Sequence, residues 1–174
     1  MGKKLWFALS IGFLALWGCG GPVISKEIRA EAWPIKGLAE VRQHPDQFKD
    51  KTIIVGGEII DTINHEDETT TLIVLDHALD NRGRPEDWEI SQGRFMVHSS
   101  QFLDPVVYAK GREVTVAGIV TGVKIAPVGE TRYRYVVLNA RQVYLWPPRS
   151  RAVFPAYLYW PSYYPDRGNY RDLP

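Results

Sequence analysis

The residues between Thr52 and Trp146 constrain the fold most strongly, because runs of β-branched residues there are repeatedly interrupted by glycine. β-Branched side chains favour strands, and a glycine inside a strand indicates a bulge or a sharp bend. Gly56-Gly57, Gly118 and Gly122 hold such positions. Bent strands are what closure of a small barrel requires. The pattern therefore predicts an all-β domain whose strands close into a barrel.

About five strands are predicted from these runs, each bounded by polar, glycine or proline residues. They cover residues 52–63, 69–75, 94–98, 113–125 and 133–146. A hairpin loop is predicted at His65–Glu68 and a long loop at 80–92. One or two helical turns are predicted at 104–110, where Asp104 is a suitable N-cap and Gly111 a suitable end.

Strands in this number, with a helix between the third and the fourth, follow the order of an OB-type Greek-key barrel. The predicted fold class is therefore all-β with minor helix, in the form of a small OB-like Greek-key β-barrel. Another small β-barrel or a β-sandwich is the alternative. Ahead of the first strand, Leu38 and Val41 have helical spacing, and Pro45 ends that short helix. We place the barrel domain at residues 35–146.

The first residues are typical of an export signal and not of a folded domain. Lys3 and Lys4 form a cationic start, and Leu5–Leu16 is almost wholly apolar. This run is shorter than the roughly 20 apolar residues that span a bilayer, which favours a signal peptide over a membrane helix. Residues 1–18 are therefore predicted to be a signal peptide.

The signal ends in a sequence that resembles a lipobox, the processing motif of bacterial lipoproteins. Leu16 is the branched aliphatic residue, Gly18 is the small residue before Cys19, and Trp17 is larger than usual between them. A thiol is the nucleophile that can form the thioether to diacylglycerol. Cys19 is the chain's only cysteine, so no disulfide can use it. We predict cleavage before Cys19 and its lipidation; a plain signal peptide with an incidental cysteine is the alternative.

Lipidation predicts where the protein works. A single acyl chain anchors only marginally, whereas several chains anchor stably. Gly20 follows the cysteine in place of Asp, and by the sorting rules of enteric bacteria this favours the outer membrane. We expect a lipid-anchored protein of the bacterial outer membrane that faces the periplasm. Residues 19–34 show no sustained apolar period and are predicted to be a lipidated tether.

The C-terminal residues differ from the barrel in composition. Residues 147–174 hold six of the chain's 12 prolines and five of its nine tyrosines. Proline-rich segments do not pair as central strands, so a disordered Pro/Tyr-rich tail is predicted. The aromatic residues there, together with Arg149, Arg151, Arg167 and Arg171, offer an alternative role in contacting lipid headgroups or a glycan.

Charge limits the partners. The formal net charge of +1 becomes −1 once residues 1–18 are removed, because they contain Lys3 and Lys4 and no acid. A polyanion binder would carry a strong basic excess, so no nucleic-acid partner is expected. Trp88, Tyr133 and Tyr135 are predicted to be core or rim aromatics. The expected partners are the membrane, through acyl chains on Cys19, and an envelope protein or glycan.

Short motifs occur in a distinctive order along the mature chain. They are Ile24-Ser25-Lys26-Glu27, Gly56-Gly57-Glu58-Ile59, Gly93-Arg94-Phe95, Gly111-Arg112, Val114-Thr115-Val116 with Gly118, and Leu145-Trp146. In this order after a lipobox, they resemble the Slp family of outer-membrane lipoproteins. The resemblance covers about residues 19–146 and leaves the C-terminal tail outside the family core. It implies an outer-membrane location and a barrel architecture, and it supplies no catalytic activity.

Three groups of polar residues are candidate sites. His65, Glu66, Asp67 and Glu68 include ligand types for a divalent cation, but neighbouring hairpin residues point in alternating directions. A solvated loop is therefore expected, with no metal and no cofactor. Asp76-His77 suggests acid–base chemistry, yet no Gly-x-Ser-x-Gly elbow accompanies it, and Ser91, Ser99 and Ser100 lack that setting. Asp76 is expected to end a strand.

Arg84, Arg94 and Arg112 form the third group, a speculative anion or ligand face on the barrel. The planar guanidinium suits carboxylate and phosphate. Surface ion pairing with Glu86, Asp87 or Glu113 is the favoured interpretation.

The leading hypothesis is an outer-membrane-anchored, non-enzymatic structural or binding module of the envelope. A binding protein for a small or polymeric envelope ligand through the barrel face is the second. A weak cell-wall-directed hydrolase is the third. An open pocket with convergent polar groups favours binding, and a carboxyl with a perturbed pKa in that pocket favours the enzyme.

Overall fold

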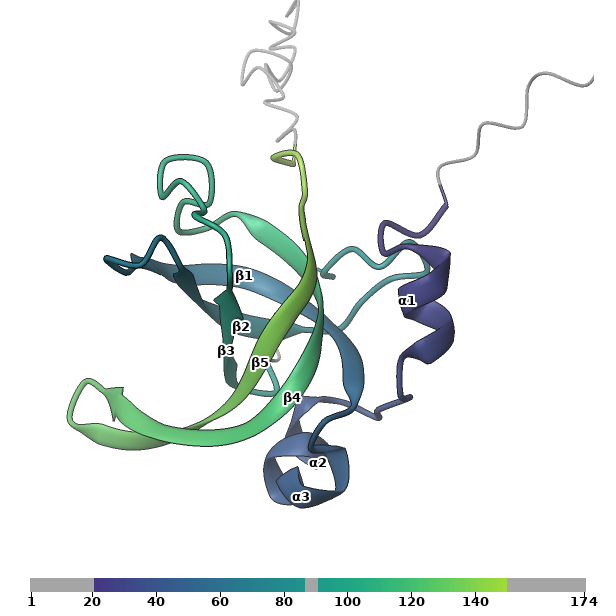
Figure 1. Ribbon diagram of the computed structural model, residues 1–174, viewed down its shortest axis with the longest axis horizontal. Coiled ribbons are helices and arrows are strands. Elements are labelled where there is room, and N and C mark those ends of the chain that lie inside the picture. The colour runs from purple at the N-terminus through teal and green to yellow at the C-terminus, as the bar shows by residue number, and fades with distance from the viewer. Residues whose placement is uncertain (1–20, 87–90, 150–174) are drawn as a thin grey trace, which may run out of the picture.

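The computed structural model describes residues 21–86 and 91–149 (Figure 1). Five strands follow three short helices along the chain. The helices are α1 (Lys26–Glu31), α2 (Leu38–Gln43) and α3 (Pro45–Phe48); the strands are β1 (Thr52–Asn64), β2 (Thr70–His77), β3 (Arg94–Ser99), β4 (Glu113–Val128) and β5 (Thr131–Leu145). The predicted strands are confirmed, with β4 and β5 each extended toward their shared hairpin.

The strands form a closed barrel in the order β1-β2-β3-β5-β4. Neighbours are antiparallel except β3 and β5, which run parallel over Phe95–His98 and Val136–Asn139. A five-stranded Greek-key barrel with this order is the OB arrangement. The predicted fold class is therefore confirmed. The predicted signal peptide and most of the predicted tail lie outside the described residues.

The glycines bend and pack the barrel in two different ways. Register shifts occur at Gly118 and Gly122 in the β4–β5 ladder, where bends were predicted. A bulge or a sharp bend was predicted at Gly56-Gly57; the register shift in β1 lies further along, between Ile59 and Asp61. A Cβ on Gly57 would lie 1.7 Å from the carbonyl oxygen of Leu75. Glycine at this position therefore permits the close approach of β1 and β2.

Side chains that point inward fill the barrel. Its largest fully buried members come from α2 and from every strand, and they include Phe95, Leu38, Ile53, Ile59, Leu72, Leu138, Val41 and Val74. A smaller cluster of Met96, Tyr135 and Val137 packs under the extended β4–β5 hairpin. Burial of this aliphatic area is the main favourable term in the folding of such a barrel.

Helices α2 and α3 close one end of the barrel, at the bottom of Figure 1. Leu38, Val41 and Phe48 belong to the core cluster. The helix predicted between the third and fourth strands is wrong: residues 105–107 form a hydrogen-bonded turn, and Asp104 accepts the backbone N–H of Val106 through its side chain. The connection buries Leu103 in the core cluster and leaves Val106 and Val107 exposed, so its apolar residues do not form one helical face.

The residues predicted as a free tether are folded from Val23 onward. Ser25 caps α1 by accepting the N–H of Ile28. Ile24 is buried, and the N–H of Trp33 donates to the carbonyl of Thr52. Within the described part of the chain, no helix has the length and apolarity that crossing a membrane demands.

Candidate functional site

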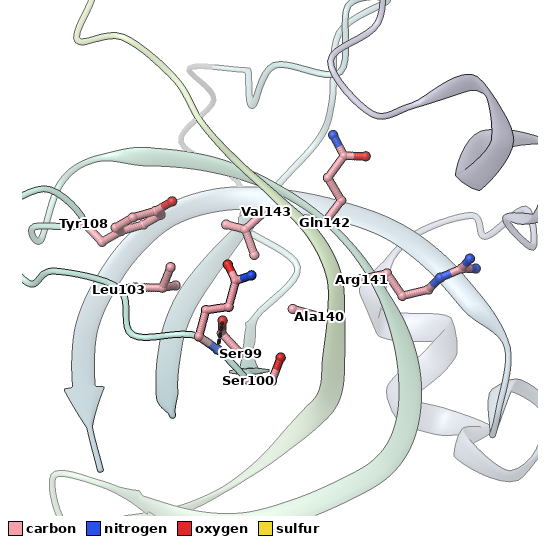
Figure 2. Close-up of a pocket in the computed structure, with 9 residues that line it drawn as sticks. Ser99, Ser100, Leu103, Tyr108, Ala140, Arg141, Gln142 and Val143 are labelled. Carbon is pink, nitrogen blue, oxygen red and sulfur yellow. Dashed lines mark hydrogen bonds between the residues drawn. The ribbon is translucent and has the colours of Figure 1, made fainter. Parts of the chain in front are cut away.

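A groove of about 290 Å³ lies beside β5, where the chain leaves β3 (Figure 2). Leu103 and Tyr108 line it from the β3–β4 connection, and Ala140 and Val143 face them from β5. Polar residues complete the lining: Ser99, Ser100, Gln101, Arg141 and Gln142. The groove therefore combines an apolar floor with hydroxyl and amide groups at its margin.

The groove exists because β3 and β5 separate. β5 pairs with β4 along Thr131–Leu145, but its pairing with β3 stops at Asn139. After Ser99 the chain turns away, and the N–H of Leu103 donates to the Thr70 hydroxyl. Among the described strands, none pairs with this edge of β5 beyond Asn139. A strand edge of this kind presents unpaired backbone donors and acceptors.

A bulge in β5 ties the N-terminal segment to the back of the groove. Arg141 is the extra residue between the pairs that Ala140 and Gln142 make with β4, and both long side chains point away from the groove (Figure 2). Gln142 accepts the N–H of Ser25 and donates to the carbonyl of Val23, each at 3.0 Å. Arg141 pairs with a carboxylate of α1 at 2.6 Å.

A second hollow, of about 220 Å³, lies between β2 and the start of α2. Asp76 and His77 both line it, and Asp76 is only 6% exposed. Burial raises the pKa of Asp76 to about 7, while the charge of Arg42 acts in the opposite direction. The two ring nitrogens of His77 are buried and have no hydrogen-bond partner among the described residues.

This hollow does not assemble a hydrolytic set from the residues that line it. Asp76 lies one residue before the end of β2, close to the strand end predicted for it. Ser91 bonds both the carbonyl and the N–H of Gly93 through its hydroxyl. Ser99 and Ser100 line the other groove, beside β5. A carboxyl with a raised pKa is present, but no serine is among the described residues that line this hollow.

Two of the three singled-out arginines meet at one rim of the barrel. Arg84 pairs with Glu113 at 2.7 Å, as the ion-pair interpretation predicted, and stacks over Trp146. Arg112 donates to the carbonyls of Val107 and Trp146. Both terminal nitrogens of Arg112 are therefore used within the fold, whereas its buried Nε has no hydrogen-bond partner among the described residues.

Arg94 lies apart from them. One row of paired residues runs across four neighbouring strands, from β3 through β2 and β1 to β4. Its members, in that order, are Arg94, Leu75, Glu58 and Glu113. Three strand spacings of ~4.8 Å separate Arg94 from Glu113 in that row. The structure thus does not gather the three arginines around one anion.

Arg149 is a residue that sequence reasoning missed. It was assigned to a disordered tail, but it pairs with Glu113 at 2.7 Å and donates to the carbonyl of Pro85. No local pattern marks this contact, because it joins residues far apart in the sequence. The other predicted tail residues, from 150 onward, lie outside the described residues.

The His65–Glu68 loop is held by its own hydrogen bonds. Asp67 accepts the hydroxyl and the N–H of Thr69, and these bonds lower the pKa of that carboxyl. His65 contacts the hydroxyl of Thr71 at 2.8 Å. The described residues contain no group of three or more His, Cys, Asp or Glu side chains that could hold a metal ion.

Tyr133 and Tyr135 are core and rim aromatics, as predicted. Their rings contact edge to face with centroids 4.9 Å apart, and Tyr135 is buried. The Tyr133 hydroxyl accepts a bond from Arg42. Trp88 lies outside the described residues, as do Leu16, Trp17, Gly18 and Cys19.

A family model described as the outer membrane lipoprotein Slp family matches residues 16–171. The chain belongs to this family. The match extends beyond the expected limit at Trp146 and includes most of the tail that was placed outside the family core. Membership makes the protein an envelope lipoprotein of a family named for the outer membrane.

Two curated relatives come from Escherichia coli (strain K12). The lipoprotein YeaY is 29% identical over 135 residues, which is 78% of this Slp-family chain and 69% of YeaY. The outer membrane protein Slp is 28% identical over 140 residues, which is 79% of this chain and 72% of that protein.

Solved structures with some similarity include a small single-stranded DNA-binding protein from Streptomyces coelicolor. It is 15% identical, with a TM-score of 0.36, and covers 55% of this chain and 94% of its own. A mitochondrial single-stranded DNA-binding protein from S. cerevisiae has a TM-score of 0.34 at 12% identity, covering 56% of this chain and 94% of its own.

Proposed function

We propose that this Slp-family protein is held at the periplasmic surface of the outer membrane by acyl chains on Cys19 and acts there as a non-enzymatic binding module. One observation carries the proposal: the chain is docked on the barrel from Val23 onward. Gln142 holds Val23 and Ser25, and Ile24 is buried. An anchor on Cys19 would therefore fix the position of the barrel.

The reach of the anchor follows from covalent geometry. Val23 is four residues after Cys19, and an extended chain spans at most ~3.6 Å per residue. The acylated cysteine therefore lies within about 14 Å of the barrel surface. A stable anchor with such a short link keeps the groove beside β5 near the membrane, where envelope partners are met.

The groove fits an extended polypeptide segment of an envelope protein. The β5 edge beyond Asn139 can pair with an added strand through backbone hydrogen bonds. Ser99, Ser100 and Gln101 would supply side-chain hydrogen bonds, and Leu103 with Val143 would receive an apolar side chain. A glycan has hydroxyls but no row of backbone amides, so it would make fewer hydrogen bonds to the backbone at the edge of β5 than a peptide strand would.

Catalysis and nucleic-acid binding are not part of the proposal. Asp76 and His77 have no serine nucleophile beside them, and the mature chain carries no basic excess with which to bind polyanions. A serine hydrolase would require a nucleophile together with Asp76 and His77, and the serines that line a hollow, Ser99 and Ser100, line the other one.

Membrane fractionation tests the attachment. Wild type is expected in the outer-membrane fraction after sucrose-gradient separation, and Cys19→Ser is expected to leave that fraction. Gly20→Ala is the matched control and is expected to fractionate as wild type. Outer-membrane recovery of Cys19→Ser equal to that of wild type would contradict the anchor.

Site-specific photo-crosslinking in cells tests the groove. A photoreactive residue at Ser100 is expected to capture an envelope protein, whereas the same residue at the exposed Glu66 is expected to give no such product. Capture of a glycan, and of no protein, at Ser100 would contradict the polypeptide ligand and would show that the groove binds a polymeric sugar. Equal products at both positions would reject the groove as the binding site.

A further inference from the structure

We propose that one rim of the barrel, the anchor rim, rests directly on the membrane that holds the acyl chains, with the β3–β4 connection inserted among the lipid headgroups. The anchor rim comprises Val23 and residues 81–84, 102, 104–107, 109–112 and 147–149; Leu103 and Tyr108 line the groove beside β5 instead. This inference rests on the lipid anchor proposed above. It adds an orientation of the whole barrel and an interaction surface for lipid.

The β3–β4 connection is unusually apolar for an exposed segment. Phe102, Val106 and Val107 are 57%, 84% and 45% exposed. Single exposed apolar residues are ordinary, but several in one short segment mark an interaction surface. Side chains of this type bury readily at the boundary between headgroups and acyl chains.

Hydrogen bonds link this connection to the point where the anchor leaves the barrel. Val23 donates its N–H to the carbonyl of Arg82, and Arg84 of the same loop reaches Glu113 and Pro147. Around the same rim, Arg112 donates to the carbonyl of Val107. In Figure 1 the N-terminal segment, the end of β5 and the β3–β4 connection all lie at the top, opposite α2 and α3.

The short link between Cys19 and Val23 brings this rim toward the bilayer. With at most about 14 Å of extended chain between the acylated residue and the barrel, the surface around Val23 is the one that meets the lipid. A protein partner would have to enter the same narrow space. The bilayer is therefore the occupant that the geometry favours.

Basic residues outnumber acids within the anchor rim, where Asp104 is the single acid, and the other nearby acids lie beside the rim. Its basic residues are Arg82, Arg84, Lys110, Arg112 and Arg149, and the acids on it or beside it are Asp80, Asp104, Glu113, Glu58 and Glu86. Glu113 lies between Arg84 and Arg149. The basic residues of the rim are expected to add an attraction to anionic headgroups that salt weakens, whereas the contact made by the apolar residues is expected to persist at high salt.

Fluorescence quenching tests the orientation in the complete lipoprotein. The full-length acylated protein with the single substitution Val106→Cys is labelled with bimane on that cysteine. It is then reconstituted into phosphatidylethanolamine–phosphatidylglycerol vesicles that contain a doxyl-labelled lipid. The label is expected to lose about half of its emission, as for a side chain seated at the headgroup boundary. Gln47→Cys on α3 is the matched control and is expected to stay unquenched.

Phe102→Cys serves as a second position if one substitution disturbs the loop. Quenching at positions 102 and 106, but not at 47, supports the inference. An acylated, vesicle-bound protein whose 102 and 106 labels are unquenched overturns the orientation and leaves the anchor intact. A protein that carries no acyl chains on Cys19, measured by mass in the same sample, overturns both proposals.

Discussion

Asp76 is the residue whose environment departs most from what its type requires. It occupies an inward position of β2, between Val74 and the end of the strand, where an apolar side chain would ordinarily be buried. Removing a carboxylate from water disfavours its charged form, and Arg42 offsets only part of that cost. The alternating pattern of β2 indicated that Asp76 points inward. How deeply Asp76 is buried also depends on the packing of α2, and the sequence of β2 carries no information about that packing.

Replacement of Asp76 by Asn is expected to stabilise the protein at alkaline pH. With a pKa of about 7 when folded and 3.8 as the ordinary value, the folded state holds a proton that the unfolded state has lost between those values. The contribution to stability is therefore full below pH 3.8 and is lost as the pH rises through 7. Asp76→Asn removes that loss, which is on the order of a few kcal/mol at most.

Thermal unfolding at several pH values measures this effect. The difference in Tm between Asp76→Asn and wild type is expected to be larger at pH 8 than at pH 5. Asp61→Asn, at an exposed position of β1, is the control. A Tm difference that does not change with pH would show that Asp76 ionises normally in the folded protein.

Glu113 is expected to contribute to stability through two guanidinium groups at once. It joins the 80–84 loop to the C-terminal segment through Arg84 and Arg149. Because these side chains are 20–40% exposed, Glu113→Gln is expected to cost only about 1 kcal/mol. Urea denaturation should show this, with Glu130→Gln unchanged; equal midpoints for both variants would mean that the ion pairs add nothing.

At the scale of elements, the strands and the short helix at Leu38–Gln43 followed from the sequence pattern, whereas the helix expected at 104–110 did not form. Runs of β-branched residues located β1 to β5, because each strand has a side buried in the core. The connection at 104–110 has Asp104 and Pro105 in good places for a helix start, yet the barrel was already plugged by Leu38 and Val41. Local signals for a helix carry no information about which segment occupies the barrel end.

The contacts around the groove show the same limit. Serine and glutamine at 99–101 were visible in the sequence, but the free edge of β5 depends on where β3 stops pairing with it. Arg149 and Glu113 are far apart in the chain. Such contacts depend on which strands pair and where the pairing ends. A single sequence predicts the order of the strands along the chain but not these pairings.

Gly57→Ala is expected to disrupt the β1–β2 ladder. The added Cβ would lie 1.7 Å from the carbonyl oxygen of Leu75, which is backbone and cannot rotate away. A loss of at least ~2 kcal/mol in the free energy of unfolding is expected. Gly21→Ala, with no heavy atom within 4 Å of the new Cβ, is expected to unfold like wild type. Equal stability of the two variants would contradict the close approach of the strands.

At the scale of the whole molecule, the family makes this protein an envelope lipoprotein. The N-terminal segment is docked on the barrel, so the anchor that we propose on Cys19 would hold the barrel near the membrane. The apolar β3–β4 connection and the N-terminal segment at Val23 lie on the same rim, so the proposed anchor would also set the orientation of the barrel on the membrane. The groove beside β5 then has a fixed relation to the membrane surface. Under the proposed orientation, the free edge of β5 would be presented at a defined place relative to the membrane.

Intact mass spectrometry of the protein purified from envelopes tests the central claim most directly. The account predicts a chain that begins at Cys19, has lost residues 1–18 and carries the added mass of a diacylglyceryl group and an amide-linked acyl chain. A chain that keeps its first residues, is cut elsewhere, or begins at an unmodified Cys19 would contradict it.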